Sequence, residues 1–239
     1  MRNFNRKYNE LRKINVIKNF NSFSDGSCLI SFGQTKVLCS ATIENGVPIW
    51  LRGQNKGWIT AEYSMLPGST NIRNQRESKI GKRSGRSIEI ERLIGRSIRS
   101  ITNLDKIPNI QIVLDCDVLQ ADGGTRTTSI NGAFIALCLA IKTGIKKKII
   151  AENPIKQKIA AIACGLIKED FLLDLDFEED QNTIADANFV LSEKKEVIEV
   201  QISGEKRPLS KNEFKTMFDL AEIGIKQIID LQTKIIHEL

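Results

Sequence analysis

The stretch from Asp115 to Ile130 reads DCDVLQADGGTRTTSI, and it constrains the fold more than any other part of the chain. An apolar strand pattern runs into a pair of glycines, an arginine and several hydroxyl side chains, and a helix pattern follows. Gly123 and Gly124 let the backbone approach a ligand closely, the first amides of the helix point at that ligand, and Arg126 adds a guanidinium fork. This order predicts a strand, a tight loop and a helix that together form an anion pocket.

A simpler interpretation of the same segment stays open at this point. The glycine pair lacks the spacing of a P-loop and of a dinucleotide fingerprint. Taken alone, it could be an ordinary helix N-terminus capped by Thr127, Thr128 or Ser129. The helical pattern itself covers Ser129–Thr143, and Gly144 is expected to close it.

Periodicity elsewhere alternates between strands and helices with no repeat and no Pro/Ser-rich linker. It predicts one compact α/β (α+β) domain over residues 1–239, with a mixed, largely buried β-sheet and packed helices. Expected strands are Ser27–Phe32 and Lys36–Ile43 as a hairpin, Trp58–Tyr63, Ile110–Leu119, Lys156–Ile167, Leu172–Phe177, Asn188–Leu191 and Val197–Ile202. Further helices are expected at Ser87–Ile101 and after a capping box of Ser210 and Glu213.

Composition limits the kinds of binding partner and the cellular compartment that we expect. The net charge of +6 favours a polyanionic partner such as nucleic acid, although many soluble proteins are equally basic. The five cysteines form no CxxC pair, so they are expected to be small buried side chains in a reducing compartment. The charged N-terminus does not resemble a signal peptide, and no apolar stretch is expected to be long enough to span a membrane. We therefore expect a cytoplasmic protein with no membrane partner.

The inventory of reactive side chains limits the chemistry. The single histidine, His237, lies at the C-terminus, which excludes Ser-His-Asp and Cys-His catalysis and histidine-rich zinc sites. Arginines, carboxylates and an external metal remain. Arg86 opens a helix beside Gly85, where the helix dipole favours an anion, whereas the other arginines of this helix could simply pair with Glu89, Glu91 or a neighbouring subunit.

Two charged segments each allow two interpretations. LDLDFEEDQNTIAD carries six carboxylates, and Asp180 and Asp186 stand near the ends of two adjacent strands, where they could hold Mg²⁺. The simpler interpretation is a solvated acidic turn. The basic segment from Met65 to Gly85 could contact RNA or could be a solvated connector.

Five long motifs occur in one order along the chain: GWITAEYSMLP, GRSIEIERLIGRSIR, DCDVLQADGGTRTTSI, LDLDFEED and EVQISGE. In these motifs the chain closely resembles the ribonuclease PH family, bacterial phosphate-dependent exoribonucleases of tRNA maturation, over essentially its whole length. The resemblance implies a ribonuclease PH-like fold and a ring-shaped homo-hexamer, a trimer of dimers. It also implies roles for individual residues. Inorganic phosphate would be bound by Arg86, Gly124, Thr125 and Arg126, the catalytic carboxylates and divalent-metal (Mg²⁺) ligands would be Asp180 and Asp186, and the tRNA acceptor stem would be contacted by Arg73 and Arg76.

The activity implied by the resemblance is 3'-to-5' phosphorolysis. Inorganic phosphate, the co-substrate, would release nucleoside diphosphates from the 3' ends of tRNA precursors and other RNA, with Arg86 as part of the catalytic set. Two alternatives are an inactive ring subunit that only binds RNA and a metal-dependent hydrolytic nuclease.

The sequence departs from the family pattern at two places. Gly68 stands where the family usually has an arginine, so this loop carries one cation fewer for RNA. Ile202-Ser203-Gly204-Glu205 stands where the family reads GTAE, and we expect this second departure to lie away from the phosphate and metal residues.

Overall fold

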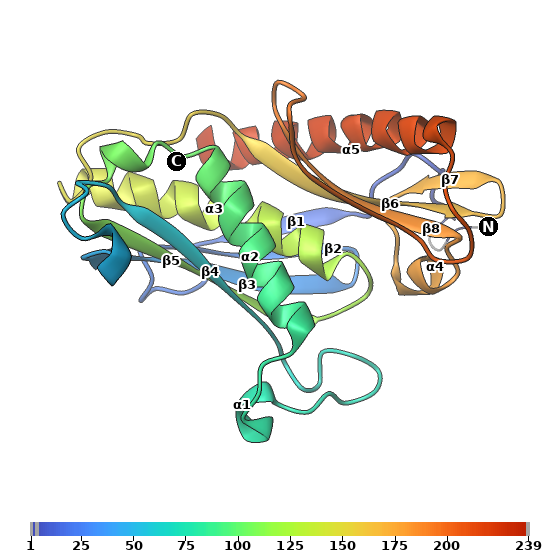
Figure 1. Cartoon of the computed structure of the whole chain (residues 1–239), viewed down its shortest axis with the longest axis horizontal. Helices are drawn as coiled ribbons and strands as arrows, with labels where there is room; N and C mark the ends of the chain where they lie inside the picture. Colours follow the sequence, from blue (N-terminus) through green and yellow to red (C-terminus); the bar gives the residue numbers. More distant parts are fainter. Residues whose placement is uncertain (1, 3–4, 238–239) are drawn as a thin grey trace.

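The computed structural model describes Arg2 and residues 5–237. In this part of the chain the strands form two sheets, and helices pack against both (Figure 1). The first sheet has five strands in the order β1-β2-β3-β5-β4. These are β1 (Ile14–Lys18), β2 (Gly26–Phe32), β3 (Thr35–Asn45), β5 (Ile110–Gln120) and β4 (Trp58–Met65).

The second sheet has four strands in the order β7-β6-β8-β9, and all its pairings are antiparallel. Its strands are β7 (Asp170–Leu173), β6 (Ile159–Ile167), β8 (Ala185–Ser192) and β9 (Val197–Gly204). The helices are α1 (Glu77–Ile80), α2 (Gly85–Ser100), α3 (Thr125–Lys146), α4 (Phe177–Gln181) and α5 (Lys211–His237), and two short 3-10 turns lie at Ile49–Leu51 and Leu104–Lys106.

The first sheet owes its form to alternating strands. Burial alternates along β5, so one face of the strand packs on α3 while the other carries Asp115 and Asp117. The expected hairpin is confirmed as β2 and β3, which pair antiparallel around Gly33. That glycine has a φ of +56°, which other residues seldom adopt. The expected buried state of the cysteines is also confirmed, since four are buried and Cys138 is half-buried.

Helix α3 is the element shared by the two sheets. It packs on β2, β3 and β5 on one side and on β6 on the other. Strand β6 is covered on its second side by α5, which explains its continuous apolar sequence IAAIACGLI. We propose that the chain is one folding unit, because a helix buried by both sheets leaves neither sheet an independent core.

A side-chain amide completes the joint between α3 and the second sheet. Asn131 is fully buried, its Nδ2 donates to the Ala161 carbonyl at 2.8 Å, and its Oδ1 accepts from the Ala161 amide at 2.8 Å. Strand β7 pairs only with the segment Cys164–Ile167 of β6. The Asn131 side chain therefore takes the place of a strand partner beyond the end of β7.

Several expected boundaries were wrong. Helix α3 begins at Thr125 rather than Ser129 and continues through Gly144 to Lys146. The expected strand Leu172–Phe177 ends at Leu173, because Asp174 adopts a positive φ and Asp176 then caps α4 through a capping box with Glu179. Strand β1 was not expected, and the basic segment contains the short helix α1. The capping box of Ser210 and Glu213 is confirmed at the start of α5.

The expectation about membrane spans also needs correction. Helix α3 is 22 residues long and apolar enough to cross a membrane by length and composition alone. Most of it is buried against the two sheets, so α3 is a core helix and the apolar side chains serve packing.

The Asn131 joint leads to a stability prediction. We expect Asn131→Leu to lower the free energy of unfolding by about 2–4 kcal/mol, because the substitution leaves the buried amide and carbonyl of Ala161 without partners. Denaturant unfolding followed by circular dichroism measures this loss. Parental stability in Asn131→Leu would show that the amide is not a needed strand partner.

Candidate active site

A cleft of about 600 Å³ lies where the first turns of α2 and α3 face α4 and the second sheet. All six residues expected to bind phosphate or metal line it: Arg86, Gly124, Thr125, Arg126, Asp180 and Asp186. They come from α2, the loop before α3, the start of α3, α4 and β8. The structure thus gathers into one cavity residues that are up to 100 positions apart in the chain.

The loop of the glycine pair forms one side of the cleft, the side expected to bind an anion. Gly123 and Gly124 have φ values of +73° and +64°, and Gly124 is the N-cap residue of α3. A Cβ on Gly123 would lie 2.6 Å from the carbonyl carbon of Asp176, so only glycine allows this close approach. The expected cap by Thr127, Thr128 or Ser129 is wrong, since no described side chain caps α3. Instead, the hydroxyls of Thr127 and Ser129 donate to the carbonyls of Gly124 and Thr125.

Two arginines flank this uncapped helix N-terminus. Arg86 lies in the first turn of α2, which begins at Gly85 rather than at the expected Ser87 and is capped by Ser84, whose Oγ accepts from the Ser87 amide at 3.0 Å. The Arg126 side chain is 17% exposed and makes an ion pair with Glu89 at 3.4 Å. Its Nε is buried and has no hydrogen-bond partner among the described residues. Such a donor beside a helix N-terminus suits an anion.

The carboxylates of Asp180 and Asp186 form the opposite side. Burial raises the pKa of the Asp186 carboxyl above its ordinary value, and the carboxylates of Asp180 and Glu205 raise it further. Burial also raises the pKa of Asp180, which remains open to solvent on one side, and the charges of Arg86 and Arg126 oppose that rise. Mutual repulsion between carboxylates in one cleft is the arrangement that a divalent cation relieves.

The carboxylates of Asp180 and Asp186 suit Mg²⁺ better than they suit a metal whose ligands all come from protein side chains. Among the described residues, no group of three histidine, cysteine or acidic side chains is arranged as a metal cluster. Mg²⁺ keeps several waters and uses one or two carboxylates together with substrate phosphates, so Asp180 and Asp186 would suffice.

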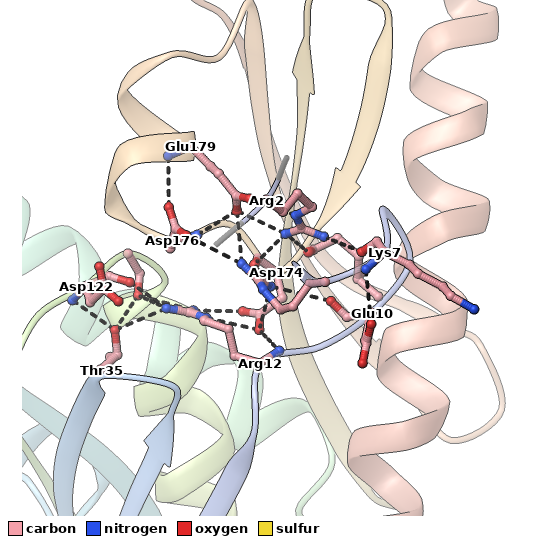
Figure 2. Close-up of polar contacts among 12 residues, drawn as sticks. Arg2, Lys7, Glu10, Arg12, Thr35, Asp122, Asp174, Asp176 and Glu179 are labelled. Carbon is pink, nitrogen blue, oxygen red and sulfur yellow. Dashed lines mark hydrogen bonds and ion pairs between the residues drawn. The ribbon is translucent and has the colours of Figure 1, made fainter. Parts of the chain in front are cut away.

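The other acidic residues of this segment are used differently. Asp174 forms a buried pair with Arg12, whose Nη2 lies 2.7 Å from Oδ1, and Glu179 forms ion pairs with Arg2 and Arg6 (Figure 2). The segment is therefore no solvated turn. Arginines from the N-terminus hold it, while Asp180 and Asp186 are left in the cleft.

The cleft also contains residues that were not expected. Asp186 pairs directly with Ser203 across β8 and β9, and Asn188, Ser203, Glu205 and Lys206 line the cavity. The expectation that the departure at 202–205 lies away from the site was wrong. Alternation along β8 places Asp186 and Asn188 on one face, and that signal could have identified Asn188. Buried Tyr63 on β4 was also missed, and its hydroxyl donates to Thr125 Oγ1 at 3.0 Å.

The expected RNA-contacting arginines lie elsewhere. Arg73 and Arg76 are exposed in the basic loop, which extends away from the body of the molecule together with α1, and neither is among the described residues that line the cleft (Figure 1). Gly68 is exposed, and no described atom lies within 4 Å of the position of an added Cβ. Two arginines of α2 outside the cleft have other partners: Arg96 pairs with Glu199 at 2.8 Å, and Arg99 stacks over Trp58.

Two family models match the chain. The model described as 3' exoribonuclease family, domain 1, matches residues 10–142, and domain 2 of the same family matches residues 158–224. The chain belongs to the 3' exoribonuclease family. The first model covers the first sheet with α2 and most of α3, and the second covers the second sheet and the first part of α5.

Solved structures share this fold at low sequence identity. Rice (Oryza sativa) Rrp46 is 21% identical with a TM-score of 0.80, and the match covers 97% of this chain and 98% of that one. A chain of the Archaeoglobus fulgidus exosome with RNA bound to the active site is 21% identical with a TM-score of 0.77, over 96% of this chain and 91% of that one. An archaeal exosome core chain has a TM-score of 0.71 at 20% identity, over 96% and 88%. These likenesses confirm the mixed α/β fold.

The repulsion in the cleft leads to a prediction about metal. Because its pKa is raised in the fold, ionised Asp186 costs stability at neutral pH. We expect Asp186→Asn in metal-free buffer to raise the melting temperature by roughly 2–4 °C, the shift that ~1 kcal/mol produces after solvent screening. Mg²⁺ should then stabilise the parent and leave the variant unchanged. Equal responses to Mg²⁺ in differential scanning calorimetry would show that Asp186 is no ligand.

Proposed function

We propose that this chain is a phosphorolytic 3'-to-5' exoribonuclease of the ribonuclease PH type, a tRNA nucleotidyltransferase that trims tRNA precursors and other RNA 3' ends. One observation carries the proposal: an uncapped helix N-terminus with Arg86 and Arg126 faces Asp180 and Asp186 across a single cleft. A hydrolytic nuclease would have no use for this second anion site.

The reaction needs no base or nucleophile from the protein. An oxygen of inorganic phosphate attacks the phosphorus of the last phosphodiester, and the bond to the 3'-oxygen of the preceding ribose breaks. One phosphorus–oxygen bond forms as the other breaks, and the 3'-oxygen takes the proton that the attacking hydrogen phosphate loses. The phosphate becomes the β-phosphate of the nucleoside diphosphate that leaves. Phosphate is already ionised at neutral pH, which fits a cleft without a described histidine.

The residues of the cleft would hold two anions together against their repulsion. Arg86, Arg126 and the amides at the start of α3 would bind inorganic phosphate and stabilise the charge that develops on the transferring group. Asp180 and Asp186 would hold Mg²⁺, which supplies neutralisation of the phosphodiester oxygens. Thr125, fixed by Tyr63, would complete the phosphate contacts.

Partners follow from the same proposal. The basic loop with Arg73 and Arg76 would bind the tRNA acceptor stem. The enzyme would be a cytoplasmic homo-hexamer, a trimer of dimers, in which the RNA lies on the surface that joins the basic loops to the clefts. Two of the structural neighbours are chains of exosome assemblies, which supports an assembly of several chains. If light scattering shows a monomer and that monomer is fully active, the ring-shaped hexamer is wrong.

Digestion with and without phosphate separates the candidate activities. A tRNA precursor with a short 3' extension should be shortened only when phosphate and Mg²⁺ are both present, with nucleoside diphosphates as the products. Asp180→Asn, which keeps size and removes charge, should abolish this activity and retain RNA binding. Nucleoside monophosphates released without phosphate would identify a hydrolase, and binding without digestion would identify an inactive ring subunit.

The phosphate arginines can be tested one by one. Each would make charge-assisted hydrogen bonds worth about 1.5–3 kcal/mol, so Arg86→Ala or Arg126→Ala should weaken apparent phosphate affinity by roughly 10- to 100-fold. Arg92→Ala is the matched control, because Arg92 is an exposed arginine of α2 outside the cleft. A parental phosphate KM in either cleft variant would show that its arginine is structural.

A further inference from the structure

We propose that Thr35 and Arg12 are positioning residues that aim the backbone amides of the glycine loop into the cleft and couple that loop to the carboxylate side. The inference deepens the proposed function, because it names residues outside the cleft on which phosphate affinity depends. Neither residue lines the described cleft, and both are buried, Thr35 at 0% and Arg12 at 4% exposure.

The Thr35 hydroxyl makes hydrogen bonds with two backbone atoms of the glycine loop. It begins β3, directly after the β2–β3 hairpin turn. Its hydroxyl donates to the Gly123 carbonyl at 2.7 Å and accepts from the Asp122 amide at 2.9 Å. A hydroxyl has one hydrogen and two lone pairs, so both contacts form at once.

Arg12, in the N-terminal segment, makes hydrogen bonds with the same loop. Its Nη1 donates to the Asp122 carbonyl, and its Nη2 lies 3.4 Å from the Gly123 carbonyl (Figure 2). The carbonyl groups of two consecutive residues are thereby drawn toward one buried guanidinium. With Thr35, this makes a clamp on the carbonyl side of the glycine loop.

The clamp decides where the amides of the loop point. In a trans peptide the N–H points opposite to the C=O, so fixing the carbonyls of Asp122 and Gly123 fixes the amides of Gly123 and Gly124. Those amides point away from the clamp, and Gly124 lines the cleft. Glycines at positive φ have many accessible backbone conformations, so this loop needs an external hold to present the amides in one direction.

The guanidinium also reaches the carboxylate side. Arg12 binds Asp174 through Nε at 3.1 Å and Nη2 at 2.7 Å, and its own amide donates to Oδ2 at 2.7 Å. Asp174 opens the segment that leads into α4 and Asp180. One buried fork therefore ties the loop before α3 to the segment before α4, and it sets the separation between the two sides of the cleft.

The hydroxyl of Thr35 is the sharper probe of the clamp. Removing Arg12 would leave the buried Asp174 carboxylate with only Arg6, at 3.9 Å, as a charge partner and would strongly destabilise the whole fold. Thr35→Val keeps shape and removes only the hydroxyl, and Thr35→Ser restores it. Thr102→Val is the matched control, since Thr102 is 2% exposed and its hydroxyl donates to the Ile98 carbonyl at 2.8 Å, at the far end of α2.

Phosphate titration and amide exchange test the inference together. Steady-state trimming should show a phosphate KM raised about 10-fold in Thr35→Val, with kcat changed less than about 3-fold, and recovery in Thr35→Ser. Hydrogen–deuterium exchange on the phosphate-free proteins should show faster exchange across 122–127 in Thr35→Val alone. Thr102→Val should lose comparable thermal stability and keep the parental KM.

The outcomes separate the inference from the proposed function. A parental KM and parental exchange in Thr35→Val would overturn the inference even when phosphorolysis is present. If the parent itself shows no phosphorolysis, the proposed function fails, and exchange across 122–127 together with calorimetric titration of inorganic phosphate still decides whether Thr35 holds the loop.

Discussion

Helix α3 lies between the two sheets, and the remainder of the architecture follows from that burial. From Thr127 to Ile141 every residue is buried except Cys138, which is half-buried. Strands β2, β3 and β5 cover one side of the helix, and β6 covers another. A helix enclosed in this way has a fixed axis, so its N-terminus at Thr125 is held at the boundary between the two sheets. The glycine loop that precedes it can then serve as a rigid part of a binding site.

The boundary between the sheets also holds a concentration of charged side chains, whose burial costs desolvation free energy. Arg12 and Asp174 are both almost fully buried, and such a pair offsets its desolvation only when the geometry is good and the remaining donors are used. Here the remaining donors go to the carbonyls of the glycine loop. In the cleft, burial raises the pKa of both the Asp180 and the Asp186 carboxyl groups, and the charge of Asp180 raises that of Asp186 further. The fold thus places well-paired charges behind the site and poorly compensated charges inside it, as expected where binding supplies the missing partner.

Local sequence could predict the parts of the site that local structure builds. The strand, glycine pair and helix around Gly123 follow from residue types within a few positions, and so do Arg86 at the start of α2 and the acidic segment before Asp186. The resemblance to ribonuclease PH named the same residues, and the cleft brings them together.

Contacts between distant segments could not be predicted in this way. The pairing of Asp186 with Ser203 depends on the register of β8 and β9, so the segment 202–205 was wrongly placed outside the site. Arg12 meets Asp174 across 162 positions, and nothing in its neighbourhood marks it as different from other basic residues near the N-terminus. Helix α3 was expected to end at Gly144, yet the packing of Gly144 against Ile43 and Ile150 makes a small residue necessary inside the helix.

We propose that the cleft brings a free phosphate ion and an RNA 3' end together between Arg86, Arg126 and the two aspartates. Incubation of the protein with unlabelled RNA, Mg²⁺ and ³²P-labelled inorganic phosphate tests it most directly. Each released nucleotide should be a diphosphate that carries the label in its β-phosphate. Release of unlabelled nucleoside monophosphates would contradict it.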